Sequence, residues 1–165
     1  ERVKGVVGSI DDLPFQKDEF DLIWSEGAID NIGFEKGLRY WNGFLKANGY
    51  VVVSCPSWLA GERPAEIEKF WTDAGSSLDS MEHNISAMQT AGFAMVAAFS
   101  LPDTCWTENY FAPREAALVA LAAKYPGNET VQAYIEENQY EVDLFTKYSQ
   151  YYGYVFYIGK KIRNL

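Results

Sequence analysis

Short apolar runs alternate with amphipathic segments along this chain, a pattern that is typical of an α/β protein. Five segments combine apolar or β-branched residues with Gly, Pro or polar residues at their ends, and we expect them to be strands: 2–10, 20–24, 50–55, 93–101 and 154–158. The compact run at 20–24 is also expected to be covered on both faces, as in a parallel sheet.

Helical spacing separates these runs. Phe34, Leu38, Trp41 and Leu45 recur every three or four residues before Asn48-Gly49, which predicts a helix with a left-handed stop. A strand, a helix and a second strand form a βαβ unit, so the two strands are expected to be parallel.

Two more helices are expected between the third and fourth of these runs, 50–55 and 93–101. Pro64 opens the first, with Ile67 and Phe70 on its apolar face. Asp79 and Glu82 have the spacing of a capping box at the start of the second.

The pattern changes between residues 102 and 152, where two helical segments follow one another before the final strand. We interpret this stretch as a helical, lid-like insertion within one domain spanning residues 1–165. The order of elements predicts an α/β fold with a Rossmann-like, mostly parallel sheet.

Composition narrows the possible functions. The 165 residues are 48% hydrophobic, enough for one well-filled core. A formal net charge of -9 argues against nucleic-acid binding, and the basic stretch Lys160–Arg163 is too short to reverse that. No segment has the apolar length of a membrane span, so we expect a cytoplasmic protein with no membrane partner.

The cysteine and histidine content is low. Cys55, Cys105 and His83 are too few for an ordinary Cys/His zinc site, so no metal is expected. The two cysteines are expected to be free thiols. As a lone histidine, His83 is more readily explained as a surface or capping residue than as a general base.

Three segments, in this order, resemble the class I S-adenosylmethionine-dependent methyltransferases that act on small molecules. They are Gly8-Ser9-Ile10-Asp11-Asp12-Leu13-Pro14-Phe15, Phe20 to Ile29 (FDLIWSEGAI), and Leu45 to Val53 (LKANGYVVV). Each motif alone is weak, but their order and the helix between the second and third are specific. The resemblance implies S-adenosylmethionine as cofactor and an antiparallel strand at 154–158.

The resemblance also implies where the cofactor binds. Ser9 and Ile10 match the positions that hold the adenine, although Ser9 replaces the usual Asp, so the contact with the adenine amine could pass to Asp11. Trp24 and Ser25 match the positions beside the methionine portion of the cofactor.

Acceptor chemistry is expected beyond the strand at 20–24. Glu26 could accept a proton from the nucleophile or pair with a cationic amine, or it could simply cap the turn or face solvent. Trp58, Trp106 and Tyr110 are candidates for the wall of a substrate site. Packing the insertion against the sheet explains each of these aromatic residues equally well.

The family's glycine-rich first loop is not found in these 165 residues. We therefore expect the N-terminal βα units to lie outside this chain, and the chain alone to be inactive. In the family sheet order 3-2-1-4-5-7-6, the strand at 2–10 would be separated from the strand at 20–24, leaving an open edge that a second copy could cover.

Two alternatives remain beside a methyltransferase. One is a non-catalytic interaction or dimerisation domain, suggested by the missing loop and by Ser9. The other is a fragment of a nicotinamide-dependent oxidoreductase, which explains neither the Asp12-Leu13-Pro14-Phe15 motif nor the terminal strand.

Overall fold

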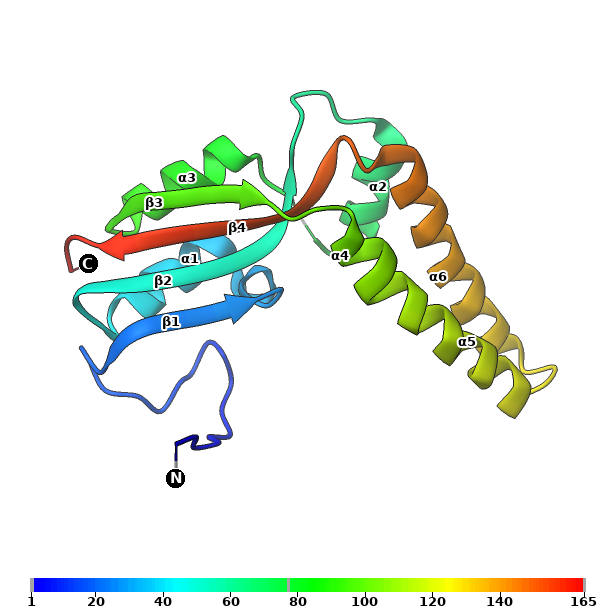
Figure 1. Cartoon of the computed structure of the whole chain (residues 1–165), viewed down its shortest axis with the longest axis horizontal. Coiled ribbons are helices and arrows are strands. Elements are labelled where there is room, and N and C mark those ends of the chain that lie inside the picture. The colour runs from blue at the N-terminus through cyan, green and yellow to red at the C-terminus, as the bar shows by residue number, and fades with distance from the viewer. Residues whose placement is uncertain (1, 77, 165) are drawn as a thin grey trace.

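The computed structural model describes residues 2–76 and 78–164 and contains a four-stranded sheet of order β1-β2-β4-β3 (Figure 1). β1 is parallel to β2, whereas β4 is antiparallel to both β2 and β3. Three strands therefore run one way and the last runs the other, which confirms the predicted mostly parallel sheet with an antiparallel final strand. The strands are β1 (Phe20–Glu26), β2 (Leu45–Trp58), β3 (Phe93–Ser100) and β4 (Tyr152–Lys161).

Helices and turns connect the strands in the predicted order. They are η1 (Ile29–Ile32), α1 (Phe34–Asn42), α2 (Ala65–Asp73), α3 (Met81–Thr90), α4 (Thr104–Trp106), η2 (Thr107–Phe111), α5 (Ala112–Lys124) and α6 (Glu129–Tyr148). Several boundaries differ from the expectation, and β2 and β4 extend at both ends beyond the predicted strands at 50–55 and 154–158. Leu45 begins β2 rather than ending α1, and Ser80, not Asp79, caps α3 by accepting a hydrogen bond from the His83 amide.

One face of the sheet is covered by α1 and α3. Alternate residues of β2 and β4, among them Val53 and Tyr157, point to this side and pack with Leu38 and Trp41 of α1 and Met88 of α3. Trp41 is 3% exposed and belongs to this core. Packing of the predicted amphipathic stripe onto the sheet forms the main core.

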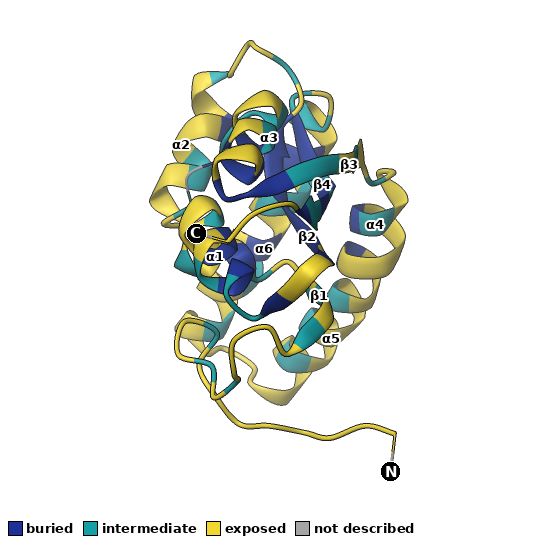
Figure 2. Ribbon diagram, turned by 90° about the vertical axis from the view of Figure 1, so that its left-hand side faces the viewer, coloured by how far each residue is buried: buried dark blue, intermediate teal, exposed yellow. Residues whose placement is uncertain are grey.

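The opposite face is largely uncovered next to β1. Leu22 and Trp24 lie on it with Tyr50 and Phe99, and these four side chains are between 41% and 60% exposed. Figure 2 shows the contrast between the exposed β1 and the buried strands beside it. The prediction that residues 20–24 are covered on both faces is wrong, because α1 and α3 both lie on the other side.

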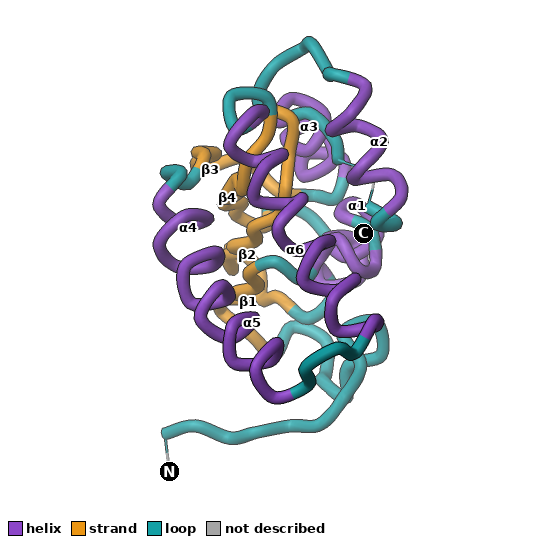
Figure 3. The backbone as a smooth tube through the Cα atoms, turned by 90° about the vertical axis from the view of Figure 1, so that its right-hand side faces the viewer, coloured by secondary structure: helices purple, strands orange, loops and turns teal. Residues whose placement is uncertain are grey.

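A second core cluster lies where the paired strands β2 and β4 continue past the ends of β1 and β3. Trp58 and Tyr152 pack there with Trp106, Phe145 and Ile67, so residues from α2, α4 and α6 meet the strand ends. α5 has no buried residue and pairs with α6 in a hairpin that projects from the sheet (Figures 1 and 3).

None of the described helices is both long and apolar enough to cross a membrane.

The N-terminal segment is not a strand. The predicted strand at 2–10 is an irregular, mostly exposed stretch with a single bridge between Ser9 and Asp12. A strand needs a neighbour to complete its hydrogen bonds, and no described strand lies beside residues 2–8, so the β-branched composition has no ladder to join.

Lys161 is buried although the sequence places it in a basic terminal stretch. Its side chain is 2% exposed, and Nζ donates hydrogen bonds to the carbonyls of Asn42 and Leu45 at 2.7 and 2.5 Å. Asp18 lies 3.3 Å away and balances the charge. The ammonium group thus fastens the end of β4 to the turn between α1 and β2.

Candidate functional site

The carboxyl ends of the parallel strands β1 and β2 lie together, which is where α/β proteins usually bind ligands. Glu26 ends β1 and is exposed. The indole nitrogen of Trp24 donates a hydrogen bond to Glu26 Oε1 at 2.5 Å, so both side chains lie on the uncovered face of the sheet. The indole thereby fixes the direction of the carboxylate.

Gly27 makes the turn that leaves the strand. Its φ is +56°, and its amide donates hydrogen bonds to the carbonyl and the hydroxyl of Ser54. A Cβ at this position would lie 3.3 Å from the hydroxyl oxygen of Tyr154. The glycine therefore permits close approach between the end of β1 and β4.

Tyr154, which lies next to this turn, also lines a cavity of about 350 Å³, which we call the aromatic pocket. Its walls come from α2, from α4 with the π-helical turn η2, from α6 and from β4. The pocket is lined by Trp71, Cys105, Trp106, Tyr110, Glu141 and Tyr154. Its volume and its mainly aromatic lining suit a small organic ligand.

Charge at the rim of the aromatic pocket is balanced. Arg114 forms an ion pair with Glu141 in which both side chains are mostly buried. The guanidinium also lies 4.5 Å from the ring centre of Tyr110 and donates a hydrogen bond to its hydroxyl at 2.9 Å. Burial, with nearby acidic groups as a smaller cause, raises the pKa of Tyr154 to about 12, so its hydroxyl stays protonated.

The predicted substrate wall is only partly assembled. Trp106 and Tyr110 lie together, 5.9 Å between ring centres, and Trp106 lies 5.2 Å from Tyr154. Trp58 is 3% exposed in the second core cluster and is not among the lining residues. Its position explains it as a packing residue, and a substrate contact by Trp58 gains no support from this geometry.

The predicted cofactor residues lie in two places. Ser9 and Asp11 are exposed and hydrogen bonded to each other, and this bond lowers the pKa of Asp11. The carbonyl of Ile10 accepts a hydrogen bond from Trp41, which ties the segment to α1. Trp24 and Ser25 are neighbours on β1 and therefore point to opposite faces of the sheet.

Four residues of the aromatic pocket were not predicted as site residues: Trp71, Cys105, Glu141 and Tyr154. Tyr154 and Trp71 carry apolar patterns that indicate a strand and a helix core and nothing more. Glu141 is one of many charged residues on α6. The π-helical turn that carries Tyr110 is a feature often found at functional sites, but it is not visible in the sequence.

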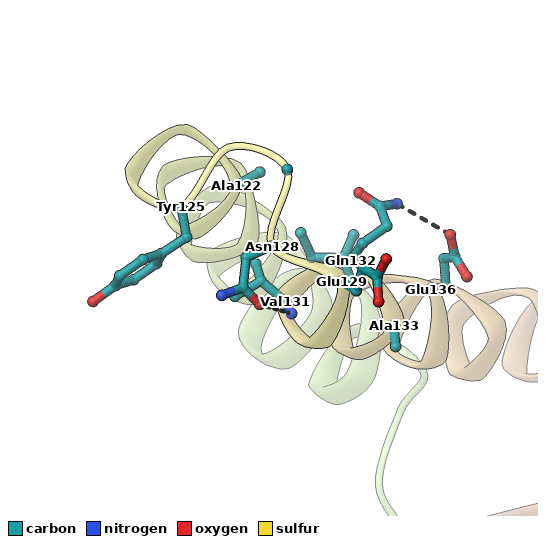
Figure 4. A pocket seen from close by; sticks show the side chains of 10 residues that line it. Ala122, Tyr125, Asn128, Glu129, Val131, Gln132, Ala133 and Glu136 are labelled. Atoms are coloured by element: carbon teal, nitrogen blue, oxygen red, sulfur yellow. Dashed lines mark hydrogen bonds between the residues drawn. The ribbon is translucent and has the colours of Figure 1, made fainter.

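A further cavity, of about 330 Å³, lies at the tip of the α5–α6 hairpin (Figure 4). Asn128 caps α6 there by accepting a hydrogen bond from the Val131 amide, and Gln132 donates to Glu136. Both hydrogen bonds are internal to α6 and its N-cap. The cavity lies at the end of the hairpin far from the sheet, so we do not assign it to the candidate site.

No protein-family model matches the sequence, and no curated protein matches it. Several solved structures are similar to this chain. A proposed sarcosine dimethylglycine methyltransferase from Galdieria sulphuraria superposes with a TM-score of 0.75 at 16% identity, over 96% of this chain and 59% of that protein. Phosphoethanolamine N-methyltransferase 2 from Haemonchus contortus gives 0.73 at 14% identity, over 95% and 37%.

The [4+2]-cyclase SpnF is also similar, with a TM-score of 0.67 at 18% identity, over 94% of this chain and 54% of that protein. The chain thus spans well under two thirds of the length of these structures. At such identities the likeness concerns the fold, which matches the predicted family order in its last four strands, 4-5-7-6. The chain has the fold of the class I S-adenosylmethionine-dependent methyltransferases.

Proposed function

We propose that this chain forms the acceptor-binding part of an S-adenosylmethionine-dependent methyltransferase that acts on a small molecule. One observation carries the proposal. The turn at the end of β1, where Glu26 and Gly27 belong to the second resembling motif, lies against Tyr154, and Tyr154 lines the aromatic pocket. A group at the pocket mouth would therefore lie close to the strand end at which this fold binds its ligands.

The cofactor residues are part of the proposal. Ser9, Ile10 and Asp11 would hold the adenine, and Trp24 with Ser25 would lie beside the methionine portion. Their exposure fits this role, since Trp24 is 60% exposed and Ser9 and Asp11 are also open to solvent. When bound, S-adenosylmethionine supplies the activated methyl group.

Methyl transfer requires little side-chain chemistry beyond holding the acceptor in line and excluding water. Trp106 and Tyr110 would provide the apolar wall that orients the acceptor. Glu26, held by the Trp24 indole, would accept the acceptor's proton or pair with its positive charge.

We further propose that these 165 residues alone bind the cofactor weakly. The sequence contains no Gly-x-Gly-x-Gly loop, and Trp24 would contact the cofactor from one side only. Calorimetry with S-adenosylhomocysteine tests this. We expect no measurable binding to the chain alone and clear binding to a longer protein that carries the glycine loop; failure of that longer protein to bind would contradict the proposal.

Glu26→Gln tests the role of the carboxylate in the same longer protein. We expect kcat to fall by about 10²-fold or more, in the range usual for general acid–base groups, with little change in S-adenosylhomocysteine affinity. Glu62→Gln is the control, because Glu62 is exposed and lines none of the cavities described above. Unchanged kcat in the Glu26 variant would exclude the proposed role.

The exposed face of the sheet favours a second candidate, a non-catalytic dimerisation domain in which another copy covers β1. Leu22 and Tyr50 are cross-strand neighbours there and are 49% and 41% exposed. Sedimentation tests the idea: Leu22→Lys should dissociate a dimer, whereas Val119→Lys, at an exposed position on α5, should not. A chain that is monomeric at all concentrations would contradict this candidate.

A further inference from the structure

A polar cavity separate from those described above, which we call the acidic pocket, lies on the side of the sheet that α1 and α3 cover. Its volume is about 270 Å³. It is formed by the start of α1, the end of β2, the segment after α2 and the start of α3. The residues that matter below are Asp30, Phe34, Cys55, Asp79 and Asn84, and none of them lines the aromatic pocket.

Asn84 is the central feature of the acidic pocket. It is 2% exposed, and its Nδ2 donates to Ser57 Oγ at 3.3 Å and to the Tyr157 hydroxyl at 3.2 Å. The Tyr157 hydroxyl lies 2.8 Å from Ser57 Oγ, which in turn donates to the Cys55 carbonyl.

The structure places the Asn84 amide with Nδ2 toward these hydroxyls. With Nδ2 facing the hydroxyls, both amide hydrogens, the tyrosine proton and the serine proton each have an acceptor. The amide oxygen of Asn84 therefore faces away from the network, and it has no hydrogen-bond partner among the described residues. A buried carbonyl oxygen of this kind requires a hydrogen-bond donor, which a bound water or a ligand can supply.

The charged side chains that line the acidic pocket are carboxylates. Asp30 and Asp79 line the acidic pocket, and no Lys or Arg is among its described lining residues. His83 lies 3.9 Å from Asp79 but is 62% exposed. Burial, assisted by the two carboxylates, raises the pKa of Cys55 to about 12, so the thiol adds no charge of its own.

We propose that the acidic pocket binds a small organic ammonium ion that carries at least one N–H group. The N–H would donate to the Asn84 amide oxygen, Asp30 and Asp79 would balance the charge, and the ring of Phe34 would contact the carbon atoms. A metal ion fits less well, because no cluster of three His, Cys, Asp or Glu side chains suited to a metal is found in residues 2–76 and 78–164.

The test is a titration of the ¹⁵N-labelled protein with ethylammonium, followed by the side-chain amide signals of Asn84. We expect chemical-shift changes that saturate with ethylammonium concentration. Asp79→Asn should lower the affinity for ethylammonium about tenfold, a loss of roughly 1.4 kcal/mol of binding free energy. Asp103→Asn is the matched control, since it removes the same charge from an exposed position outside the acidic pocket. Asp79 is half exposed, so its substitution should leave the fold intact, as circular dichroism can check.

Tetramethylammonium separates the hydrogen bond from the charge, because it is a cation without an N–H group. We expect it to bind at least tenfold more weakly than ethylammonium. The proposal is overturned if ethylammonium causes no saturable shift, if Asp79→Asn binds as well as the control, or if the two cations bind equally. In the longer protein that carries the glycine loop, Asp79→Asn should leave S-adenosylhomocysteine binding unchanged, so this proposal and the proposed function can fail separately.

Discussion

Gly27 and Tyr154 are in such close contact that a Cβ on the glycine would lie 3.3 Å from the tyrosine hydroxyl oxygen. The contact joins the end of β1 to the strand that lines the aromatic pocket, although the two residues are far apart in the sequence. Glu26, the predicted carboxylate, immediately precedes Gly27 in the chain.

Gly27→Ala should lower the free energy of unfolding by about 1–2 kcal/mol from its positive φ alone, and by more because of the contact with Tyr154. Gly127→Ala is a matched control, because Gly127 has a φ of +72° and a Cβ added there would have no atom within 4 Å. Urea denaturation should show the larger loss at Gly27. Equal losses would mean that the contact contributes nothing.

Removing the Tyr154 hydroxyl should reduce the loss of stability that Gly27→Ala causes. In the double variant with Tyr154→Phe, the atom nearest to the new methyl group is absent, so the two substitutions should cost less together than the sum of their separate costs. A double-mutant cycle in urea measures this difference. Strict additivity would show that the loop at Gly27 moves away from β4 instead.

Lys161→Met should destabilise the protein by about 2–4 kcal/mol, because the carbonyls of Asn42 and Leu45 lose their donor in a buried place. The methionine keeps most of the apolar stem, so the loss reports the ammonium group. Lys160→Met, at the less buried neighbouring position, should change stability by less than about 0.5 kcal/mol. Similar midpoints of thermal unfolding for the two variants would contradict this interpretation.

Trp106→Ala should loosen the helical insertion more than the sheet. Its ring contacts Phe145 of α6 and Tyr154 of β4 and is 5% exposed, so about 3–5 kcal/mol should be lost. Hydrogen exchange should then accelerate in α5 and α6 before β2. Tyr134→Ala, at a position 51% exposed on α6, should leave exchange unchanged; uniform acceleration over the whole chain would show that the insertion is not a separate cooperative unit.

Stability should fall at alkaline pH. Burial raises the pKa of Cys55 and of Tyr157 to about 12, whereas their ordinary values are 9.0 and 10.0. The unfolded chain therefore loses these protons first, and the free energy of unfolding should decrease from about pH 9 toward pH 12. Tyr157→Phe should flatten the slope above pH 10 while lowering stability at neutral pH. A slope equal to that of the unsubstituted protein would contradict the prediction.

Local pattern was sufficient for most of the fold. The apolar runs of β1, β2, β3 and β4 and the apolar stripe of α1 are local patterns, and their order predicted the mostly parallel sheet. The face that α1 covers was not predicted. Trp106 and Tyr110 were predicted as candidates for the substrate wall because they are aromatic residues that do not lie on core strands, and the structure places them in the same pocket.

Tertiary structure decided what pattern could not. The stretch at 2–10 has strand composition but no neighbouring strand, so it remains irregular, and Lys161 is buried because two carbonyls from another part of the chain face it. Trp58 is in the core because residues of α2, α4 and α6 pack against it. Glu141 and Tyr154 line the aromatic pocket together only because segments that are distant in the sequence pack against one another. The sequence by itself determined the elements and their order, because periodicity is local; which side chains meet in a pocket depends on long-range packing, which no local pattern records.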